Sequence, residues 1–233
     1  RGTCKVCVGD NLMAAPGVAV MILLLNCVSI MRSGSRREVY DNAKHVASYL
    51  AQQIREQRYS VWLSQSPGRT KDGNDRTAAA IVKMLGMQGQ GLRVDYEALH
   101  IVPVTISYEH EPCLVHKVRE NLLRQTSGRY DKLPGEDVVQ IRDSLVNDKG
   151  RVHLAFGTEL QLKDVADTDV VQAIVDQTDV QMASNYRCWG SNRIAHALLN
   201  GHPVDLQTPY ARSFMDRVDE QLAQLEQMGL ERQ

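Results

Sequence analysis

The chain has 233 residues, a mass of 26.1 kDa and a pI near 6.7, with 27 basic and 28 acidic side chains. A formal net charge of -1 provides no overall attraction to nucleic acid, so we expect no nucleic-acid partner. The five cysteines are an odd number, which indicates free thiols rather than a disulfide framework.

The N-terminal part opens with the segment CVGDNLM at residues 7–13, whose start reads as a strand. An apolar stretch follows at residues 14–31, and its run GVAVMILLLNCVSIM is shorter than the roughly 20 residues that span a bilayer. We predict a buried helix that leads into a buried strand. The alternative, a helix that also rests on a membrane surface, lacks the flanking basic face of such helices.

Residues 35–59 predict an amphipathic helix, because apolar side chains recur at spacings of three and four opposite a charged face. Residues 61–63 then predict a buried strand, and residues 77–87 a second helix, with Pro67-Gly68 and Asp72-Gly73 as turns between them. The connection holds Arg69, Lys71 and Arg76. Basic side chains before a helix N-terminus favour an anion site. A solvated basic loop is the open alternative.

The second half continues with a hydrophobic strand in LHIVPVTISYEHEPC at residues 99–113 and a late strand in GRVHLAFGTEL at residues 150–160. Glu109 and Glu111 are interpreted as solvated charges at a strand end. His110, Cys113 and His116 have metal-like spacing but no apparent fourth ligand, so no metal is expected. The polar segment 124–137 predicts a loop.

The C-terminal helix is predicted from Thr208 as N-cap and Pro209 as first helical residue. Its apolar residues follow a short heptad seam: Met215, Val218, Leu222 and Leu225. Two heptads are too few for an independent coiled coil, so we expect docking onto the same protein. Self-association through residues 209–230 is the alternative.

Alternating strands and helices predict an α/β fold with a mixed, largely parallel sheet flanked by helices and a helical C-terminal section. Ligands of such sheets bind at the carboxyl ends of strands. Arg32 and the Gly68-Arg69 turn both follow predicted strands, so the two are expected to approach one anionic ligand.

The stretch VWLSQ-SPGR-TKDGNDRT-AAAIVKMLGM resembles the third conserved block of bacterial acyltransferases of the 1-acylglycerol-3-phosphate and glycerol-3-phosphate acyltransferase superfamily. CVGDNLM resembles the GDN strand end of that family, VSIMRS at residues 28–33 its second block, and the VPV element its fourth. The resemblance extends to about residue 201. In one departure, Pro67 stands where the family usually has glutamate.

The resemblance implies transfer of a fatty acyl group from acyl-CoA or acyl carrier protein to a glycerol-phosphate-type acceptor in phospholipid synthesis. It implies no cofactor, and a cytoplasmic location with contact at the inner face of the cytoplasmic membrane. The acyltransferase-like domain would cover residues 1–162, followed by a helical section at 163–233. The substrate-binding residues it implies are Arg32, Gly68, Arg69, Lys71, Asp75, Arg76 and Pro103.

The family's catalytic pair is missing, since no histidine of this sequence is followed five positions later by aspartate. In the family this H-x4-D pair lies upstream of the GDN strand, so we interpret the chain as an N-terminally truncated fragment that is inactive alone. One alternative is a non-catalytic phosphate- or lipid-binding module of the same fold. A P-loop nucleotide binder is disfavoured, because Asn74-Asp75 stands where Lys-Ser/Thr is needed.

Overall fold

The computed structural model describes residues 4–14, 16–56, 59–66, 70–71, 73–133 and 135–229. It confirms an α/β fold, in which helices flank a three-stranded parallel sheet and a helical section ends the chain. The chain forms two compact units that interleave along the sequence. Unit 1 comprises Arg1–Thr70, Asn74–Val104 and Phe156–Asn185, and unit 2 comprises Lys71–Gly73, Thr105–Ala155 and Tyr186–Gln233. The predicted division after residue 162 stays a prediction.

The parallel sheet of unit 1 consists of β1 (Lys5–Gly9), β2 (Val28–Ile30) and β3 (Val61–Trp62). The strand order is β2-β1-β3, with Cys7 opposite Val28 and Lys5 opposite Val61. Because all three strands are parallel, their carboxyl ends meet at one edge of the sheet.

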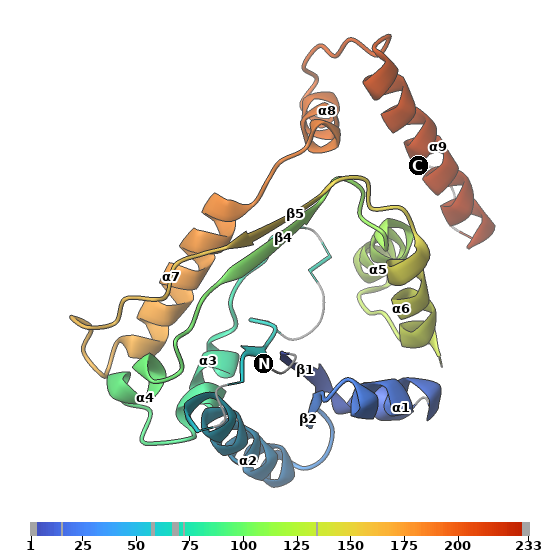
Figure 1. Ribbon diagram of the computed structural model, residues 1–233. Helices are drawn as coiled ribbons and strands as arrows, with labels where there is room; N and C mark the ends of the chain where they lie inside the picture. The colour runs from blue at the N-terminus through green and yellow to red at the C-terminus, as the bar shows by residue number, and fades with distance from the viewer. Residues whose placement is uncertain are drawn as a thin grey trace. The chain divides into compact units, whose positions relative to one another are not determined.

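The strands are linked by a 3-10 turn η1 (Asp10–Ala14), by α1 (Pro16–Leu24) and by α2 (Arg36–Arg55) (Figure 1). The prediction of α2 is confirmed. Ser35 caps it through a reciprocal capping box with Glu38, and Val46 and Leu50 are buried on its inner face. The helix ends at Arg55, four residues before the predicted end.

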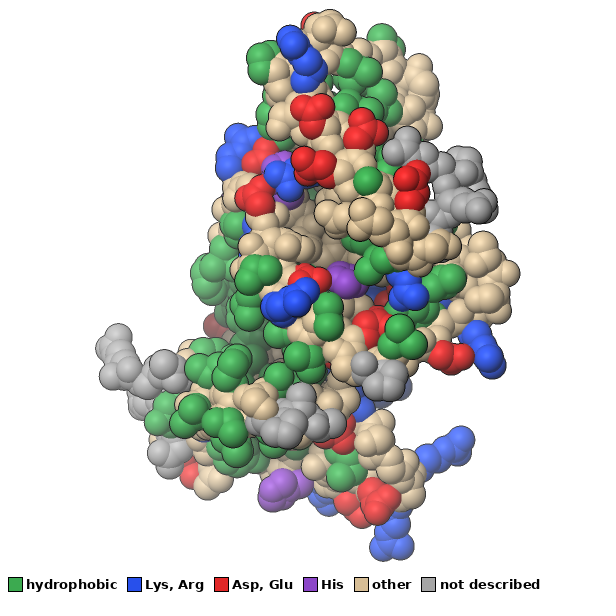
Figure 2. Space-filling model, turned by 90° about the vertical axis from the view of Figure 1, so that its right-hand side faces the viewer, with side chains coloured by type: hydrophobic (Ala, Val, Ile, Leu, Met, Phe, Trp, Pro, Cys, Tyr) green, Lys and Arg blue, Asp and Glu red, His purple; other side chains and the backbone are tan. Residues whose placement is uncertain are grey.

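The prediction that α1 is buried is wrong. Ile22 is 6% exposed, but the exposed fractions of Leu23 and Leu24 are 70% and 79%. In the space-filling view, hydrophobic side chains gather at the surface in the region of α1 (Figure 2). A nine-residue helix that is apolar all round can bury only one stripe against the rest of the fold. β2 is also only half-buried, because it is an edge strand.

The core of unit 1 lies between α3 (Ala79–Gly86), α4 (Arg93–Glu97) and α7 (Val170–Asn185). Its buried side chains are Val82, Tyr96, Leu160, Leu162, Val170 and Ile174. A Cβ at Gly86 would lie 2.3 Å from the Tyr96 hydroxyl, so glycine is what lets α4 approach α3.

A second sheet pairs β4 (Val104–Tyr108) with β5 (Val152–Phe156), which run side by side in Figure 1. The backbone N–H of Glu109 donates to Arg151, and that of Gly157 donates to Pro103, at 2.9 and 2.8 Å. These two pairs, at opposite ends of the ladder, make the strands antiparallel. The strand with the VPV element therefore belongs to a separate sheet.

Unit 2 also contains α5 (Leu114–Ser127), α6 (Glu136–Val146), α8 (Gly190–Leu199) and α9 (Pro209–Gln227). The prediction of a loop from residue 124 is wrong, because α5 continues to Ser127 and ends at Gly128 in the left-handed conformation. For α9 both the Thr208 cap and the first residue Pro209 are confirmed. α9 packs against α5 and buries Leu225, as docking onto the same protein requires.

Of the helices in the described part of the chain, none combines the length and the apolar character needed to cross a membrane.

Candidate functional site

The carboxyl edge of the parallel sheet joins the ends of β1 and β2. The Asp10 carboxylate, directly after β1, accepts hydrogen bonds from the backbone N–H of Arg32 at 3.1 Å and the Ser33 hydroxyl at 3.2 Å. The next N–H upstream, that of Met31, donates to the Asn42 side chain on α2 at 3.0 Å. The turn after β2 is thereby fixed to the turn after β1.

The Arg32 guanidinium lies against the backbone of Gly9, the last residue of β1. A Cβ at position 9 would stand 2.7 Å from Arg32 Nε and 2.5 Å from Asn11 Oδ1, so only glycine allows this approach. Arg32 is exposed, and within the described ranges no carboxylate forms an ion pair with it. A guanidinium held at a strand end without a carboxylate partner can bind an external anion bidentately.

Lys71, a second predicted phosphate ligand, belongs to unit 2 and is neutralised there. Its ammonium forms an ion pair with the buried carboxylate of Glu120, which also binds Arg124 at 2.9 Å. Burial alone would raise the pKa of Glu120, but hydrogen bonds and charge from Lys71 and Arg124 outweigh it and lower the pKa. Glu120 therefore stays ionised and Lys71 serves an internal pair.

Arg76 is likewise engaged by a carboxylate of the chain itself. Its guanidinium lies 3.5 Å from Asp179 of α7, and the other oxygen of Asp179 accepts the backbone N–H of Thr77 at 2.8 Å. α3 begins at Ala79, two residues later than predicted, and its N-cap Ala78 makes no side-chain cap bond. Asp179 thus occupies the entry to α3, where we had expected an external anion.

The remaining predicted ligands are Asp75, Pro103, Gly68 and Arg69. Asp75 is exposed and accepts a hydrogen bond from the Thr70 hydroxyl at 2.9 Å, inside the same loop. Pro103 is buried next to β4 and offers only its carbonyl, which binds Gly157. Gly68 and Arg69 lie outside the described residues, so their predicted approach to Arg32 is untested.

The metal-like spacing of His110, Cys113 and His116, where no metal is expected, does not assemble a site. The Cys113 thiol is buried and donates to the Gln140 carbonyl at 3.4 Å, and His116 pairs with Asp143 at 2.8 Å. Within the part of the chain that the structure describes, no group of three His, Cys, Asp or Glu side chains is placed to hold a metal ion. Burial, with Cys4 and Cys27 nearby, raises the pKa of the Cys7 thiol to about 12, which makes it a poor nucleophile.

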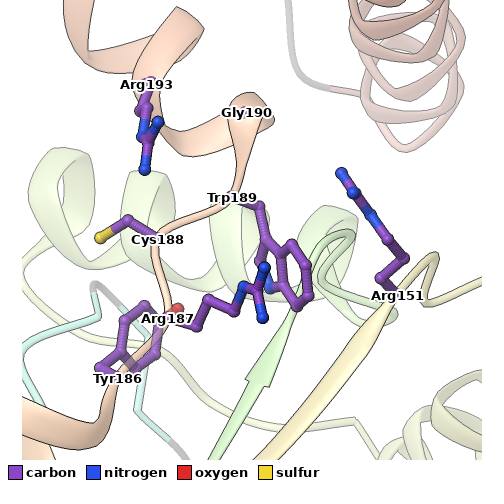
Figure 3. Close-up of a pocket in the computed structure, with 7 residues that line it drawn as sticks. All are labelled: Arg151, Tyr186, Arg187, Cys188, Trp189, Gly190 and Arg193. Carbon is purple, nitrogen blue, oxygen red and sulfur yellow. The ribbon is translucent and has the colours of Figure 1, made fainter.

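The interpretation of Glu109 as a solvated charge is wrong, since the side chain is buried and organises unit 2. It accepts two hydrogen bonds from the Arg151 guanidinium at 2.9 and 2.8 Å and one from the Tyr210 hydroxyl at 2.6 Å. These bonds hold Arg151 beside Trp189, in a pocket lined by residues 186–190 and Arg193 (Figure 3). No sequence pattern predicts this pocket. Its only local signal was the cluster of arginines around Trp189.

Comparison of the chain with protein families, with curated proteins and with solved structures finds no match.

Proposed function

We propose that the chain is the acceptor-binding part of a glycerolipid-type acyltransferase. Such an enzyme moves a fatty acyl group from acyl-CoA or acyl carrier protein to a glycerol-phosphate-type hydroxyl in phospholipid synthesis. One observation carries the proposal. The segments that resemble the GDN strand end, the second block and the third block contain the carboxyl ends of β1, β2 and β3, which form one parallel sheet. Motifs at neighbouring carboxyl ends can serve one ligand.

Arg32 is the residue to which we assign most of the phosphate binding. Its guanidinium has no carboxylate partner among the described residues, whereas the Lys71 ammonium is paired with Glu120 and the Arg76 guanidinium with Asp179. The Asp10 carboxylate fixes the backbone of Arg32 by accepting its N–H at 3.1 Å. A ligand phosphate would therefore meet the Arg32 guanidinium without displacing an internal carboxylate.

The transfer step needs a base that residues 1–233 do not supply as an H-x4-D pair. The base would take the proton of the acceptor hydroxyl, the hydroxyl oxygen would form the ester bond with the thioester carbonyl, and the thiol would leave with a proton. The part assigned to this chain is positioning, because a phosphate bound at the sheet edge holds the hydroxyl in place. We place this activity at the cytoplasmic face of a membrane, with the exposed apolar side chains of α1 as the contact.

A non-catalytic phosphate- or lipid-binding module of the same fold is the second candidate. It is favoured by the missing H-x4-D pair and by the engagement of Lys71 and Arg76 in internal ion pairs. The two candidates share the binding site at Arg32 and differ in turnover once a base is provided.

Calorimetric titration with glycerol 3-phosphate tests the proposal. We expect a Kd of about 1 mM, equivalent to roughly 4 kcal/mol, that weakens as salt screens the exposed guanidinium. Arg32→Ala should weaken binding by about tenfold or more, the effect of losing one charge-assisted hydrogen-bonding group. Gly9→Ala should also weaken it, because its Cβ displaces the Arg32 guanidinium, whose Nε it would approach to 2.7 Å.

Arg37→Ala is the matched control, because it removes the same charge from a side chain of α2 that is 92% exposed. It should leave the Kd unchanged. Binding of ATP but not of glycerol 3-phosphate would contradict the acceptor assignment. Robust acyl transfer by residues 1–233 alone would overturn the claim that the base lies outside them.

A further inference from the structure

A pocket of about 430 Å³ in unit 2 combines three guanidinium groups with an indole ring (Figure 3). Arg151 directly precedes β5, Arg187 lies in the segment between α7 and α8, and Arg193 lies in the first turn of α8. Tyr186, Cys188, Trp189 and Gly190 complete the lining. This volume lies within the range of small-molecule sites, about 300–1,000 Å³.

The charges of the pocket do not cancel. The charge of Arg151 is matched by the Glu109 carboxylate. Hydrogen bonds from Arg151 hold the pKa of Glu109 well below its usual range. The guanidinium groups of Arg187 and Arg193 form no ion pair or side-chain hydrogen bond with any described residue. The pocket therefore carries an excess of two positive charges, provided by side chains that present forked donors.

Trp189 holds this arrangement in place. The guanidinium carbons of Arg187 and Arg151 lie 4.6 and 4.9 Å from the ring centroid, within the distance of cation–π attraction. Trp189 is only 6% exposed, and its indole Nε1–H is buried with no acceptor among the described residues. Stacking on a buried ring limits the motion of both arginines, so less conformational entropy is lost when they bind a ligand.

The start of α8 reinforces the positive potential. Trp189 is the N-cap of this ten-residue helix, and Gly190 is its first residue. A Cβ at Gly190 would stand 2.6 Å from the Tyr210 ring, so glycine lets the start of α9 pack against the start of α8. The Tyr210 hydroxyl donates to Glu109 at 2.6 Å and accepts the Ser191 N–H at 3.0 Å, which fixes the helix start to the carboxylate that holds Arg151.

We propose that this pocket binds a phosphate monoester as its dianion, at a site separate from Arg32. Two unpaired guanidinium groups match the charge of the dianion, and their forked donors match its oxygens. The rest of the volume takes the esterified group, against the exposed ring of Tyr186. Either a soluble phosphate ester or the phosphatidic acid headgroup of a membrane offers this chemistry.

The pocket contains one of the two tryptophans of the chain, which provides a direct readout. In a Trp62→Phe background, emission comes from Trp189 alone. We would titrate this protein with glycerol 3-phosphate at constant ionic strength, and separately with vesicles of phosphatidylcholine with and without phosphatidic acid. Calorimetry in the same background with Arg32→Ala added registers pocket binding that leaves the emission unchanged, because this variant removes heat from the proposed acceptor site. Arg187→Ala, Arg193→Ala and Arg187→Lys are compared, with circular dichroism to confirm folding.

We expect saturable binding that weakens at least about tenfold in both alanine variants and recovers only partly in Arg187→Lys. Arg129→Ala is the control, because Arg129 is 81% exposed in unit 2 and, among the described residues, forms an ion pair only with the exposed Asp131. Arg32→Ala should leave the Trp189 response intact, which separates this site from the proposed acceptor site. A stronger response to phosphatidic acid vesicles than to the soluble ester would identify the headgroup as the source.

The proposal is overturned if neither emission nor heat shows saturable binding of either probe by the folded protein. It is equally overturned if Arg129→Ala weakens binding as much as Arg187→Ala, because the effect would then be general charge attraction.

Discussion

At the scale of single residues, the buried carboxylates organise unit 2. Glu109 is 8% exposed and binds Arg151 and Tyr210, which come from positions far along the chain. The sequence shows that Glu109 follows a strand, but its partner Arg151 is 42 positions away, so no local pattern indicates the pair. The same holds for Glu120 and Lys71, which are 49 positions apart. Such long-range ion pairs cannot be predicted from local sequence patterns. For this reason the sequence favours Lys71 as a ligand of the substrate phosphate.

Replacing Glu109 should reveal its contribution to stability. Glu109→Gln leaves Arg151 and Tyr210 without their charged acceptor, so we expect the free energy of unfolding to fall by about 2–3 kcal/mol at pH 7. The measurement is urea unfolding at pH 7 and at pH 3.5. Glu220→Gln, an exposed change on α9, serves as the control and should stay within about 0.5 kcal/mol.

The pH dependence of this effect has a definite sign. Hydrogen bonds from Arg151 hold the folded-state pKa of Glu109 far below its usual 4.5, against the opposing effect of burial. A carboxylate with a lowered folded pKa stabilises the protein fully above its unfolded pKa, and this stabilisation is lost as the pH falls below 4.5. The difference between the wild-type protein and Glu109→Gln should therefore shrink at pH 3.5. A difference that is equal or larger at pH 3.5 would contradict the assignment.

At the scale of secondary-structure elements, the sequence predicts a helix well where the signals are local. α2 and α9 have an N-cap residue and a helical apolar period within a few residues, and both formed close to the predicted bounds. The burial of α1 is different, because it depends on what the rest of the fold places against the helix. Its apolar residues surround the axis, and the rest of the fold covers only the side that carries Ile22.

Two substitutions in α1 test this one-sided packing. Ile22→Ala removes a side chain that is 6% exposed and should lower the free energy of unfolding by about 2–4 kcal/mol. Leu24→Gln changes a residue that is 79% exposed and should stay within about 0.5 kcal/mol. Chemical denaturation of both variants is the measurement. Equal, large losses would mean that the outer face of α1 is covered.

At the scale of the whole molecule, the α/β class and the parallel pairing could be predicted from the alternation of strands and helices. The separation of β4 and β5 into their own antiparallel sheet could not, because a hydrophobic strand does not specify its partner. The same limit applies to the two sites. The edge with Asp10 and Arg32 follows from strand-end motifs, whereas the pocket needs Arg151 and the segment at 186–193 to meet through the fold.

The most direct test of the acceptor-binding role is an amide NMR titration of the ¹⁵N-labelled chain with glycerol 3-phosphate. Acceptor binding at this edge of the sheet predicts saturable chemical-shift changes at Gly9, Asp10, Arg32 and Ser33, where β1 and β2 end. It also predicts the loss of these changes in Arg32→Ala. Unchanged signals at these positions in the folded protein, at ligand concentrations well above about 1 mM, would contradict it, whatever happens at residues 186–193.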